Sequence, residues 1–333
     1  MDETLVEVTR GEVVESRHRG CVVVADGDGK VLASAGSPEL VTYIRSAAKP
    51  MQALNIIFSG ADKKFDLSTE ELALMCSSHY GETMHRQVIY RVLEKLGLST
   101  RDLLCGAPLS INPAQMRKQL SEHEIIDETC SDCSGKHCGF LAVCLARGYP
   151  IAAYNRPDHP MQREILEIMS RMCALPADKI KIGVDGCSVP VHAMPILNMA
   201  RGYARFAAPD QLESNYRAAC EKIFDAMNAA PEMIAGTGGF CTEFLKATGG
   251  RFCGKIGAEG LYCIGVKGKN MGIAVKISDG NFRALYPAVM HTLKQLDLLS
   301  PEEIAGLAPF AEPDNLNDTG VPIGKLTPVF TLH

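Results

Sequence analysis

The sequence predicts an α+β fold, similar to an α/β sandwich, in which both ends of the chain build one antiparallel sheet around an inserted helical lobe. Segments with the period of an amphipathic helix fill the middle of the chain. Short apolar runs bounded by turn residues predict strands near both ends, at residues 5–8, 21–24, 31–34, 261–266, 272–277 and 326–330. This order of elements is typical of one sheet built from both termini.

Turn residues connect neighbouring strands at both ends of the chain. Asp26-Gly-Asp-Gly29 is expected to join two of the N-terminal strands as a hairpin. Lys267-Gly-Lys-Asn270 is expected to join an antiparallel pair near the C-terminus. The approximate lobes are residues 1–45 with 250–333, which form the sheet, and 46–249, which are mainly helical. We expect the whole chain, 1–333, to act as a single catalytic unit.

The stretch Arg-Ser-Ala-Ala-Lys-Pro at 45–50 carries a serine and a lysine three residues apart. Pro50 lacks an N–H and is tolerated only near a helix start, so a helix should begin close to Ser46. Ser46 and Lys49 would then lie on one face and can touch. A serine hydroxyl needs a base, and a lysine with a lowered pKa can be one. The same spacing also occurs by chance, so its meaning depends on the other motifs.

Helix signals are strongest in the middle of the chain. Ser68-Thr-Glu-Glu71 is a capping box that opens a helix through Met75. Further helices are predicted at 84–96, 138–146, 160–172, 193–205, 210–229 and 283–297. The helix at 84–96 should bury an apolar face of Val88, Tyr90, Val92, Leu93 and Leu96. The segment 138–146 is apolar nearly all round and should be a buried helix.

Composition excludes several classes of protein. The chain has 333 residues, 46% hydrophobic and 22% charged, which is ordinary for a globular protein. Its formal net charge is −5 and it has no basic run, so a nucleic-acid partner is not expected. No apolar run approaches the ~20 residues that a membrane span needs. The acidic N-terminus lacks the apolar segment of a signal peptide, and thirteen scattered cysteines favour a reducing compartment. We therefore expect a cytoplasmic protein.

A second serine and lysine lie far apart along the chain. Ser78 is in a polar loop after a predicted helix, and Lys255-Ile-Gly lies just before a predicted strand. With the Ser46-x-x-Lys49 pair, this order is typical of serine β-lactamases and penicillin-binding proteins, so a fold of that type is predicted. The alternative is that Lys255 is an ordinary surface lysine. Two lysines close together would each lower the pKa of the other, so that one could accept a hydroxyl proton.

The third set of polar residues is Cys133, Lys136, His137 and the sequence Asp185-Gly-Cys187 at the end of a predicted strand. Cys130 and Cys133 form a Cys-x-x-Cys pair, but no second pair completes a structural zinc site. From residue types alone, a redox pair, a partial metal site and an ordinary loop are comparable alternatives. Gly236-Thr-Gly-Gly239 is interpreted as a turn, because no strand–helix unit surrounds it.

Together these motifs resemble the thermolabile L-asparaginase II family, the class 3 enzymes typified by inducible rhizobial asparaginase. The matching segments are Arg45–Lys49, Cys76–Glu82, Cys133–His137, Val184–Ser188 and Lys255–Gly260. The family is similar in fold to serine β-lactamases and glutaminases. Its members hydrolyse L-asparagine to L-aspartate and ammonia, and they resemble homodimers.

The resemblance implies roles for individual residues. It pairs Ser46 with Lys49 and Ser78 with Lys255. It implies a Zn²⁺ ion held by Cys133, Lys136 and Cys187. It also implies that His137 and Asp185 orient the substrate or metal-bound water and that Arg45 pairs with the substrate carboxylate. Cys130 and Cys138 depart from the family pattern, and with Cys241 they have no assigned role.

The resulting hypothesis is an L-asparaginase that works through a serine acyl-enzyme beside zinc, with either Ser46 or Ser78 as nucleophile. One alternative is a glutaminase or another amidohydrolase of the penicillin fold. The other is a redox or zinc-binding regulatory protein built on Cys130 and Cys133.

Overall fold

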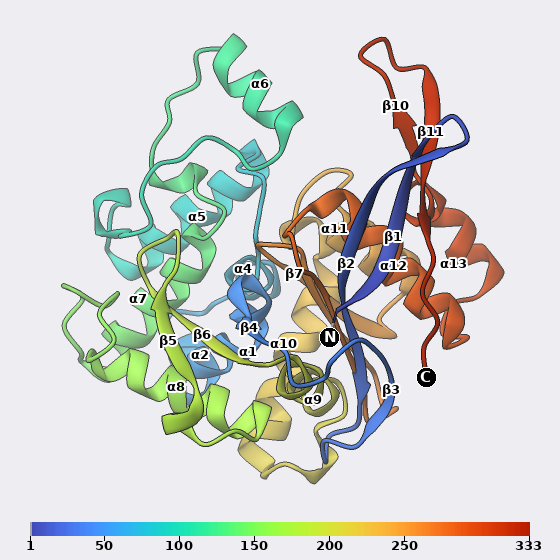
Figure 1. The fold of residues 1–333 in the computed structure, drawn as a ribbon. Coiled ribbons are helices and arrows are strands. Elements are labelled where there is room, and N and C mark those ends of the chain that lie inside the picture. The colour runs from blue at the N-terminus through green and yellow to red at the C-terminus, as the bar shows by residue number, and fades with distance from the viewer. Residues whose placement is uncertain (1) are drawn as a thin grey trace. The chain divides into compact units, whose positions relative to one another are not determined.

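The computed structural model describes residues 2–333 and divides the chain into two compact units (Figure 1). The first unit comprises the chain up to Ala47, then Met194–Ala208 and Lys246–His333. The second comprises Ala48–Ala193 and Pro209–Leu245. Residues 194–208, which the predicted lobes left with the helices, belong to the sheet-containing unit. That residues 1–333 act as a single catalytic unit stays a prediction.

An antiparallel sheet of eight described strands forms the first unit, in the order β10-β11-β1-β2-β9-β8-β7 with β3 paired to β2. Both ends of the chain meet in it, because β1 (Glu3–Arg10) pairs with β11 (Pro322–Pro328) and β2 (Val13–Ala25) pairs with β9 (Met271–Ile277). The other strands of the unit are β3 (Val31–Ala35), β4 (Val41–Tyr43), β7 (Phe252–Gly257), β8 (Leu261–Val266) and β10 (Asp314–Leu316). The predicted α+β fold with a sheet from both termini is confirmed.

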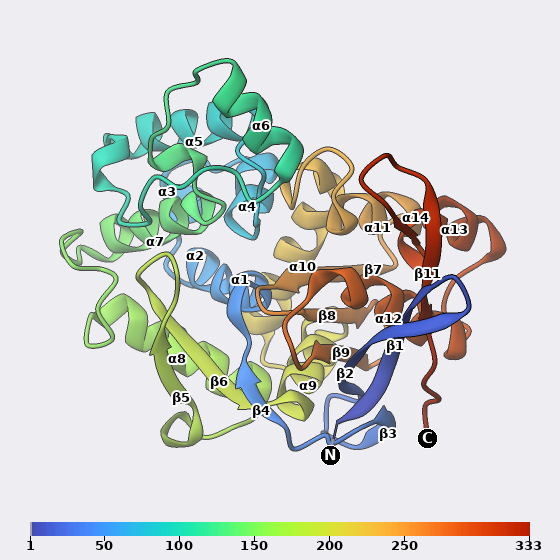
Figure 2. The same ribbon diagram turned by 45° about the horizontal axis from the view of Figure 1, so that its top comes forward.

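Two helices pack on the central strands of this sheet, α9 (Ile196–Ala207) and α12 (Phe282–Gln295) (Figure 2). A Cβ atom on Gly272 would lie 1.9 Å from the Ala200 carbonyl oxygen, so only glycine lets α9 approach β9 this closely. Every residue of β8 is buried, which means that both faces of the sheet are covered there. The first unit also contains α13 (Pro301–Gly306) and α14 (Ala308–Ala311), whereas α11 (Phe240–Thr248) begins in the second unit and ends in the first.

Helix α7 (Ser134–Arg147) is the centre of the second unit and is buried over most of its length. It packs against α2 (Leu54–Phe58), α3 (Ala61–Lys64), α4 (Thr69–Met75), α5 (Thr83–Leu96) and α8 (Pro160–Cys173). The unit also contains α1 (Lys49–Gln52), α6 (Pro113–Ser121), α10 (Ser214–Ala229) and a hairpin of β5 (Lys181–Val184) and β6 (Pro190–Pro195). Single 3-10 turns complete the chain at Arg45–Ala48, Thr100–Asp102, Glu128–Cys130, Ala177–Lys179, Pro209–Gln211 and Pro231–Met233.

Two glycines of α7 bring its first turn close to the end of α4. A Cβ atom on Gly135 would lie 2.2 Å from the Leu74 carbonyl oxygen. One on Gly139 would lie 2.9 Å from the Ile56 side chain. Residues four apart lie on the same helix face, so these glycines form a smooth strip that allows close packing. The packing places the residues that precede α7 beside the loop that follows α4.

Most predicted elements are present, and a few predictions are wrong. The capping box of Ser68 and Glu71 starts α4 as expected. Tyr90 is 45% exposed and not part of the buried face of α5, because its hydroxyl donates to Asp127 Oδ2 at 2.7 Å. The predicted helix at 193–205 begins later, since residues 190–195 form strand β6. Lys255 does not precede a strand but lies within β7.

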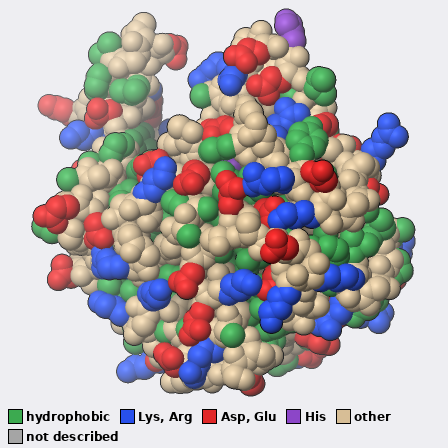
Figure 3. Space-filling model, turned by 180° about the vertical axis from the view of Figure 1, so that it is seen from behind, with side chains coloured by type: hydrophobic (Ala, Val, Ile, Leu, Met, Phe, Trp, Pro, Cys, Tyr) green, Lys and Arg blue, Asp and Glu red, His purple; other side chains and the backbone are tan. Residues whose placement is uncertain are grey.

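The surface of the molecule carries charges of both signs. On the face drawn in Figure 3, Lys and Arg side chains are mixed with Asp and Glu, and no large area carries one sign of charge. Within residues 2–333, no helix has both the length and the apolar character needed to cross a membrane.

Candidate active site

The loop after α4 presents Ser77 and Ser78 on a fixed backbone. The Ser78 N–H donates to the Ile234 carbonyl at 2.9 Å, and the Tyr80 N–H donates to the Ala235 carbonyl at 2.7 Å. Gly236 has a φ of 131°, and a Cβ atom there would lie 2.8 Å from the Tyr80 ring. The glycine-rich turn at 236–239 therefore packs against the serine loop and is needed for its shape.

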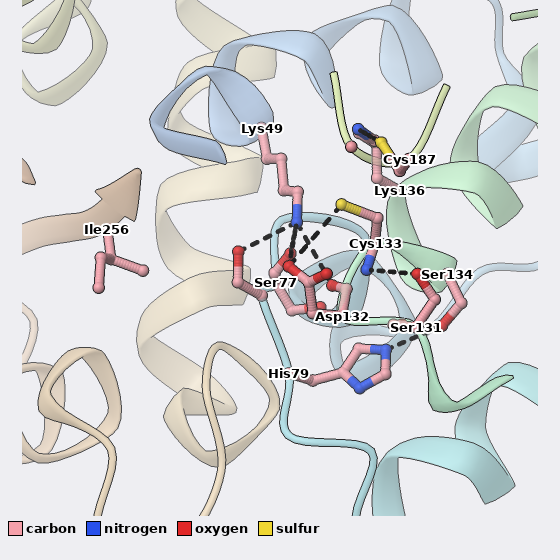
Figure 4. Close-up of polar contacts among 12 residues, drawn as sticks. Lys49, Ser77, His79, Ser131, Asp132, Cys133, Ser134, Lys136, Cys187 and Ile256 are labelled. Carbon is pink, nitrogen blue, oxygen red and sulfur yellow. Dashed lines mark hydrogen bonds and ion pairs between the residues drawn. The ribbon is translucent and has the colours of Figure 1, made fainter. Parts of the chain in front are cut away.

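The Lys49 ammonium group is the centre of the polar contacts in the second unit (Figure 4). It donates to Ser78 Oγ at 3.0 Å and to the Ser77 carbonyl at 2.5 Å. It also contacts Asp132, with 3.3 Å to the carbonyl oxygen and 3.6 Å to carboxylate Oδ2. Lys49 is 1% exposed, so these contacts replace its water. The structure thus joins Lys49 to Ser78, a contact that the motif spacing did not reveal.

The charge state of Lys49 differs from the expectation of a neutral base. Burial alone lowers the pKa of Lys49, but the negative charge of the Cys133–Cys187 pair and the carboxylate of Asp132 raise it by more. The net pKa is above the ordinary lysine value, so Lys49 is protonated at neutral pH in the state described. Lys49 is then a hydrogen-bond donor to Ser78, and it must lose a proton before it can act as a base.

Cys133 and Lys136 lie at the start of α7, and Cys187 lies in the turn between β5 and β6. That turn is tight, because the Asp185 N–H donates to the Val189 carbonyl and the Ser188 N–H donates to the Asp185 carbonyl, both at 2.9 Å. The Lys136 ammonium donates to Cys187 Sγ at 2.9 Å (Figure 4). All three side chains are buried, so two thiols and one amine share a site that is shielded from solvent.

A negative charge in this site resides on Cys187. The hydrogen bond from the Cys133 thiol lowers the pKa of Cys187, and Lys136 lowers it further, against the effect of burial. The same hydrogen bond raises the pKa of Cys133 well above its ordinary value. For Lys136, burial lowers the pKa, but the two cysteine sulfurs raise it by more. The described state is a Cys187 thiolate stabilised by a neutral thiol and an ammonium group.

The two sulfur atoms and one nitrogen atom of Cys133, Lys136 and Cys187 are donors that a soft metal ion prefers. Zn²⁺ binds thiolates and nitrogen ligands, and a three-ligand set leaves a fourth position for water or substrate. Lys136 would have to bind as the neutral amine, since its proton occupies the lone pair that a metal needs. Among residues 2–333 no cluster of three or more His, Cys, Asp or Glu side chains could hold a metal, so this site depends on the lysine.

His79 connects the serine loop to the turn that carries Cys133. Its Nε2 contacts Ser134 Oγ at 2.8 Å, and its Nδ1 accepts the Gly81 N–H at 3.0 Å (Figure 4). Because Nδ1 accepts, the proton is on Nε2 and is donated to Ser134, whose hydroxyl donates in turn to the Ser131 carbonyl at 2.8 Å. Burial lowers the pKa of His79 well below its ordinary value, so the ring is neutral.

The structure brings most of the predicted site residues into the second unit. The contacts above join Lys49 with Ser78 and Lys136 with Cys187, beside Cys133. His137 follows Lys136 in α7, is fully buried, and has Nδ1 2.6 Å from the Tyr154 hydroxyl. Asp185 begins the turn that holds Cys187, and its carboxylate accepts the Gly186 N–H at 2.9 Å.

The other three predicted residues belong to the first unit. Arg45 and Ser46 lie in the 3-10 turn Arg45–Ala48, with Arg45 at a left-handed φ of 49°. Lys255 is buried in β7, and its ammonium donates to the Ile256 carbonyl at 2.9 Å. The alternative of an exposed surface lysine is therefore wrong. The catalytic and substrate-binding roles of these three residues stay predictions.

Sequence reasoning missed three residues of the site, Asp132, His79 and Tyr154. Asp132 stands directly before Cys133, so a carboxylate inside that motif was a usable signal. His79 follows Ser78 in a motif that was singled out only for its serine. Tyr154 lies in a loop with no motif, and nothing in the sequence pointed to it.

The Cys-x-x-Cys pair does not form a disulfide. All thirteen cysteines are free thiols. Cys133 is hydrogen-bonded to Cys187, whereas the Cys130 thiol is 4.0 Å from the Ile125 carbonyl oxygen. These contacts do not favour a redox centre built on Cys130 and Cys133.

Comparison with known proteins gives one family match. A family model described as L-asparaginase II matches residues 6–328. No curated protein matches the chain. Among solved structures, the chain is similar to Mglu in its native form, with a TM-score of 0.39, 14% identity, and coverage of 86% of this chain and 66% of Mglu. The chain thus spans slightly less than two thirds of Mglu.

A second similar structure is a β-lactamase from Mycobacterium bovis. The TM-score is 0.40 at 13% identity, with 88% of this chain and 95% of the β-lactamase covered.

Proposed function

The chain belongs to the L-asparaginase II family, and on that premise we propose that it hydrolyses L-asparagine to L-aspartate and ammonia. Family membership confirms the resemblance drawn from the motifs and the coarser prediction of an amidohydrolase. The observation that carries the proposal is the buried contact of 3.0 Å between Lys49 Nζ and Ser78 Oγ, next to a thiol and amine cluster. A lysine in contact with a serine hydroxyl is the arrangement that activates a nucleophile.

The proposed reaction passes through a serine ester. A serine hydroxyl adds to the side-chain amide carbon, an O–C bond forms, and its proton is taken by a lysine amine. The C–N bond then breaks, the proton returns to the leaving nitrogen, and ammonia departs. Water hydrolyses the β-aspartyl ester and frees the serine.

The proposed catalytic residues are Ser46, Lys49, Ser78 and Lys255. Ser78 is the hydroxyl that Lys49 contacts, and Lys49 must first pass its extra proton to solvent or substrate. For Ser46 and Lys255 the support is the sequence motifs alone. Either Ser46 or Ser78 is the nucleophile. Trapping the acyl-enzyme with asparagine and mapping the modified peptide by mass spectrometry distinguishes the two.

We assign the metal site to Cys133, Lys136 and Cys187. Zinc bound there would supply a Lewis-acidic anchor that positions the substrate. The chain's own groups prepare the site, because Lys136 and Cys133 stabilise the Cys187 thiolate. Arg45, His137 and Asp185 are the proposed substrate-binding residues, with Arg45 suited to a carboxylate through paired hydrogen bonds.

An ammonia-release assay tests the substrate. Purified protein is given L-asparagine, L-glutamine or a chromogenic β-lactam, with zinc content measured in parallel. Release of ammonia from asparagine in clear preference to glutamine supports the proposal. Preference for glutamine identifies a glutaminase, hydrolysis of the β-lactam alone identifies another penicillin-fold hydrolase, and no turnover refutes an amidohydrolase role for the isolated chain.

We also propose a homodimer in the cytoplasm. The dimer rests on the family resemblance, and light scattering during gel filtration tests it. A cytoplasmic location is supported by the thirteen free thiols, since a reducing compartment keeps such thiols unpaired. Fractionation of the producing cell tests that location.

A further inference from the structure

Tyr154 lies outside every sequence motif and contacts His137, which follows Lys136 beside the thiol cluster of Cys133 and Cys187. Tyr154 lies in the loop between α7 and α8 and is fully buried. Its hydroxyl oxygen accepts the Leu104 N–H at 2.8 Å. The same hydroxyl is 2.6 Å from His137 Nδ1, and the two rings meet edge to face at 71° with centroids 5.4 Å apart.

The proton positions in the hydrogen bonds from Leu104 through Tyr154 to His137 follow from counting donors and acceptors. A phenol has one proton to donate, and Leu104 already uses one of its lone pairs. Within residues 2–333 the only hydrogen-bond acceptor that the Tyr154 hydroxyl contacts is His137 Nδ1. A proton on Nδ1 would leave the buried phenol proton without a partner, which costs free energy. The tyrosine therefore donates to Nδ1.

A nitrogen that accepts a hydrogen bond carries no proton, so the single proton of the His137 ring is on Nε2. Burial raises the pKa of Tyr154, which keeps the phenol protonated and able to donate. The imidazole interacts with the Cys187 side chain, which places the ring beside the two thiols. Nε2 itself is buried and has no hydrogen bond of normal geometry among the described residues. An N–H group is thus held ready at the thiol cluster.

We infer that Tyr154 is a positioning residue that fixes His137 with its proton on Nε2, so that His137 enters the site as a hydrogen-bond donor and not as a metal ligand. This rests on the proposed function only in naming the acceptor, which is an oxygen of the amino-acid substrate. A donor at this point favours a carboxylate or amide oxygen over a positively charged group.

The first test reads the protons directly and needs no turnover. The protein is labelled with ¹⁵N-histidine, and long-range ¹H–¹⁵N spectra identify His137 by its absence in His137→Gln. We expect a neutral ring with the proton on Nε2 and a hydrogen-bonded Nδ1. In Tyr154→Phe the Nδ1 shift should move to that of an unbonded nitrogen, while Tyr149→Phe, in the same loop, leaves it unchanged. A proton on Nδ1 in the unaltered protein overturns the inference.

The second test compares two replacements of His137. Glutamine can place an amide N–H near the position of Nε2, whereas asparagine reaches only the position of Nδ1. Zinc content should be the same in His137→Gln as in the unaltered protein, and loss of zinc there overturns the inference. The KM for asparagine should rise about tenfold in Tyr154→Phe and His137→Asn, and less in His137→Gln.

The outcomes separate this inference from the proposed function. Equal spectra and equal KM in Tyr154→Phe and Tyr149→Phe, with both variants folded by circular dichroism, overturn the role of Tyr154. If the unaltered protein does not hydrolyse asparagine but shows the expected Nε2 proton and zinc content, the inference stands and the substrate proposal fails.

Discussion

Two buried lysines, one in each unit, differ in the groups that surround their ammonium charge and in the direction of their pKa shift. Lys276 in β9 donates to two backbone carbonyls, of Glu259 at 2.5 Å and Ile277 at 2.7 Å. Burial lowers its pKa, and nearby carboxylates only partly oppose this. Lys49 also has carbonyl partners, but Asp132 and the cysteine sulfurs add negative charge, and its pKa is raised.

The difference shows that hydrogen bonds and charge compensation contribute separately to the pKa of a buried lysine. Carbonyl oxygens satisfy the donors of a lysine without cancelling its charge. A carboxylate or thiolate within contact distance does cancel it. The first unit thus buries a lysine as a structural support, while the second holds ammonium groups next to a nucleophilic hydroxyl and a thiolate. Arrangements of the second kind concentrate at functional sites.

Replacing the two lysines gives the sharpest test of this comparison. Lys49→Met should reduce kcat/KM about 10³-fold, because the Ser78 hydroxyl loses its proton partner. Lys276→Met removes a lysine of the first unit that is 8% exposed, against 1% for Lys49, and should leave kcat within about threefold of the unaltered value. Steady-state ammonia release measures both. Equal losses of activity in the two variants would mean that the two lysines differ in their surroundings but not in their catalytic role.

Metal retention distinguishes the cysteines of the second unit. Cys133→Ser should lose bound zinc on dialysis, since a serine hydroxyl is a poor ligand for that ion. Cys130→Ser should keep it, because the Cys130 thiol is directed to the Ile125 carbonyl. Elemental analysis of dialysed protein measures the difference. Zinc in both variants, or in neither, would contradict the assignment of ligands.

Acid should weaken the second unit through His192. Burial lowers the pKa of His192 to about 4. Below pH ~6.5 the unfolded chain takes up a proton that the folded protein refuses, so stability falls until about pH 4 and then levels off. The loss over that range is about 3 kcal/mol. Urea unfolding at several pH values should show that the unfolding free energy of His192→Leu declines less with acid than that of the unaltered protein. Parallel curves for the two proteins would show that His192 is not the group responsible.

The smallest expected effect compares two serines that hold turns together. Ser134→Ala breaks the link between His79 and the Ser131 carbonyl, and Ser300→Ala removes the cap of α13 in the first unit. Each should cost about 1 kcal/mol of unfolding free energy. Only Ser134→Ala should also lower kcat, by a few-fold, because the turn that it supports carries Asp132. Unchanged kcat in both variants would limit His79 to a structural role.

Much of the fold was predictable because local signals were strong. The capping box of Ser68, the proline near Ser46 and the all-apolar run at 138–146 each marked an element that the structure contains. Strand β6 was missed because its prolines at both ends, Pro190 and Pro195, are typical of turns. Strand β7 was missed because Gly254 and Gly257 lower its strand propensity, although all but one of its residues are buried.

The site was predictable only as a set of residue types. The sequence identified Lys49, Ser78 and Cys187 by motif, but their contacts join residues 29 to 51 positions apart. Spacing along the chain says nothing about such contacts, since they depend on how α7 packs on α4. The prediction that Lys49 is a neutral base was wrong for the same reason. Asp132 and the cysteine sulfurs, which raise the pKa of Lys49, were not foreseen as its neighbours.

The position of Cys187 in a hairpin, apart from the helix that carries Lys136, has a mechanical consequence. A metal ion bound to both would clip together a loop of 51 residues, the separation of these two side chains. Closing such a loop restricts the unfolded chain far more than the folded one. Removal of the ion by a chelator would then lift this restriction on the unfolded chain, so heat resistance would fall as the metal is lost.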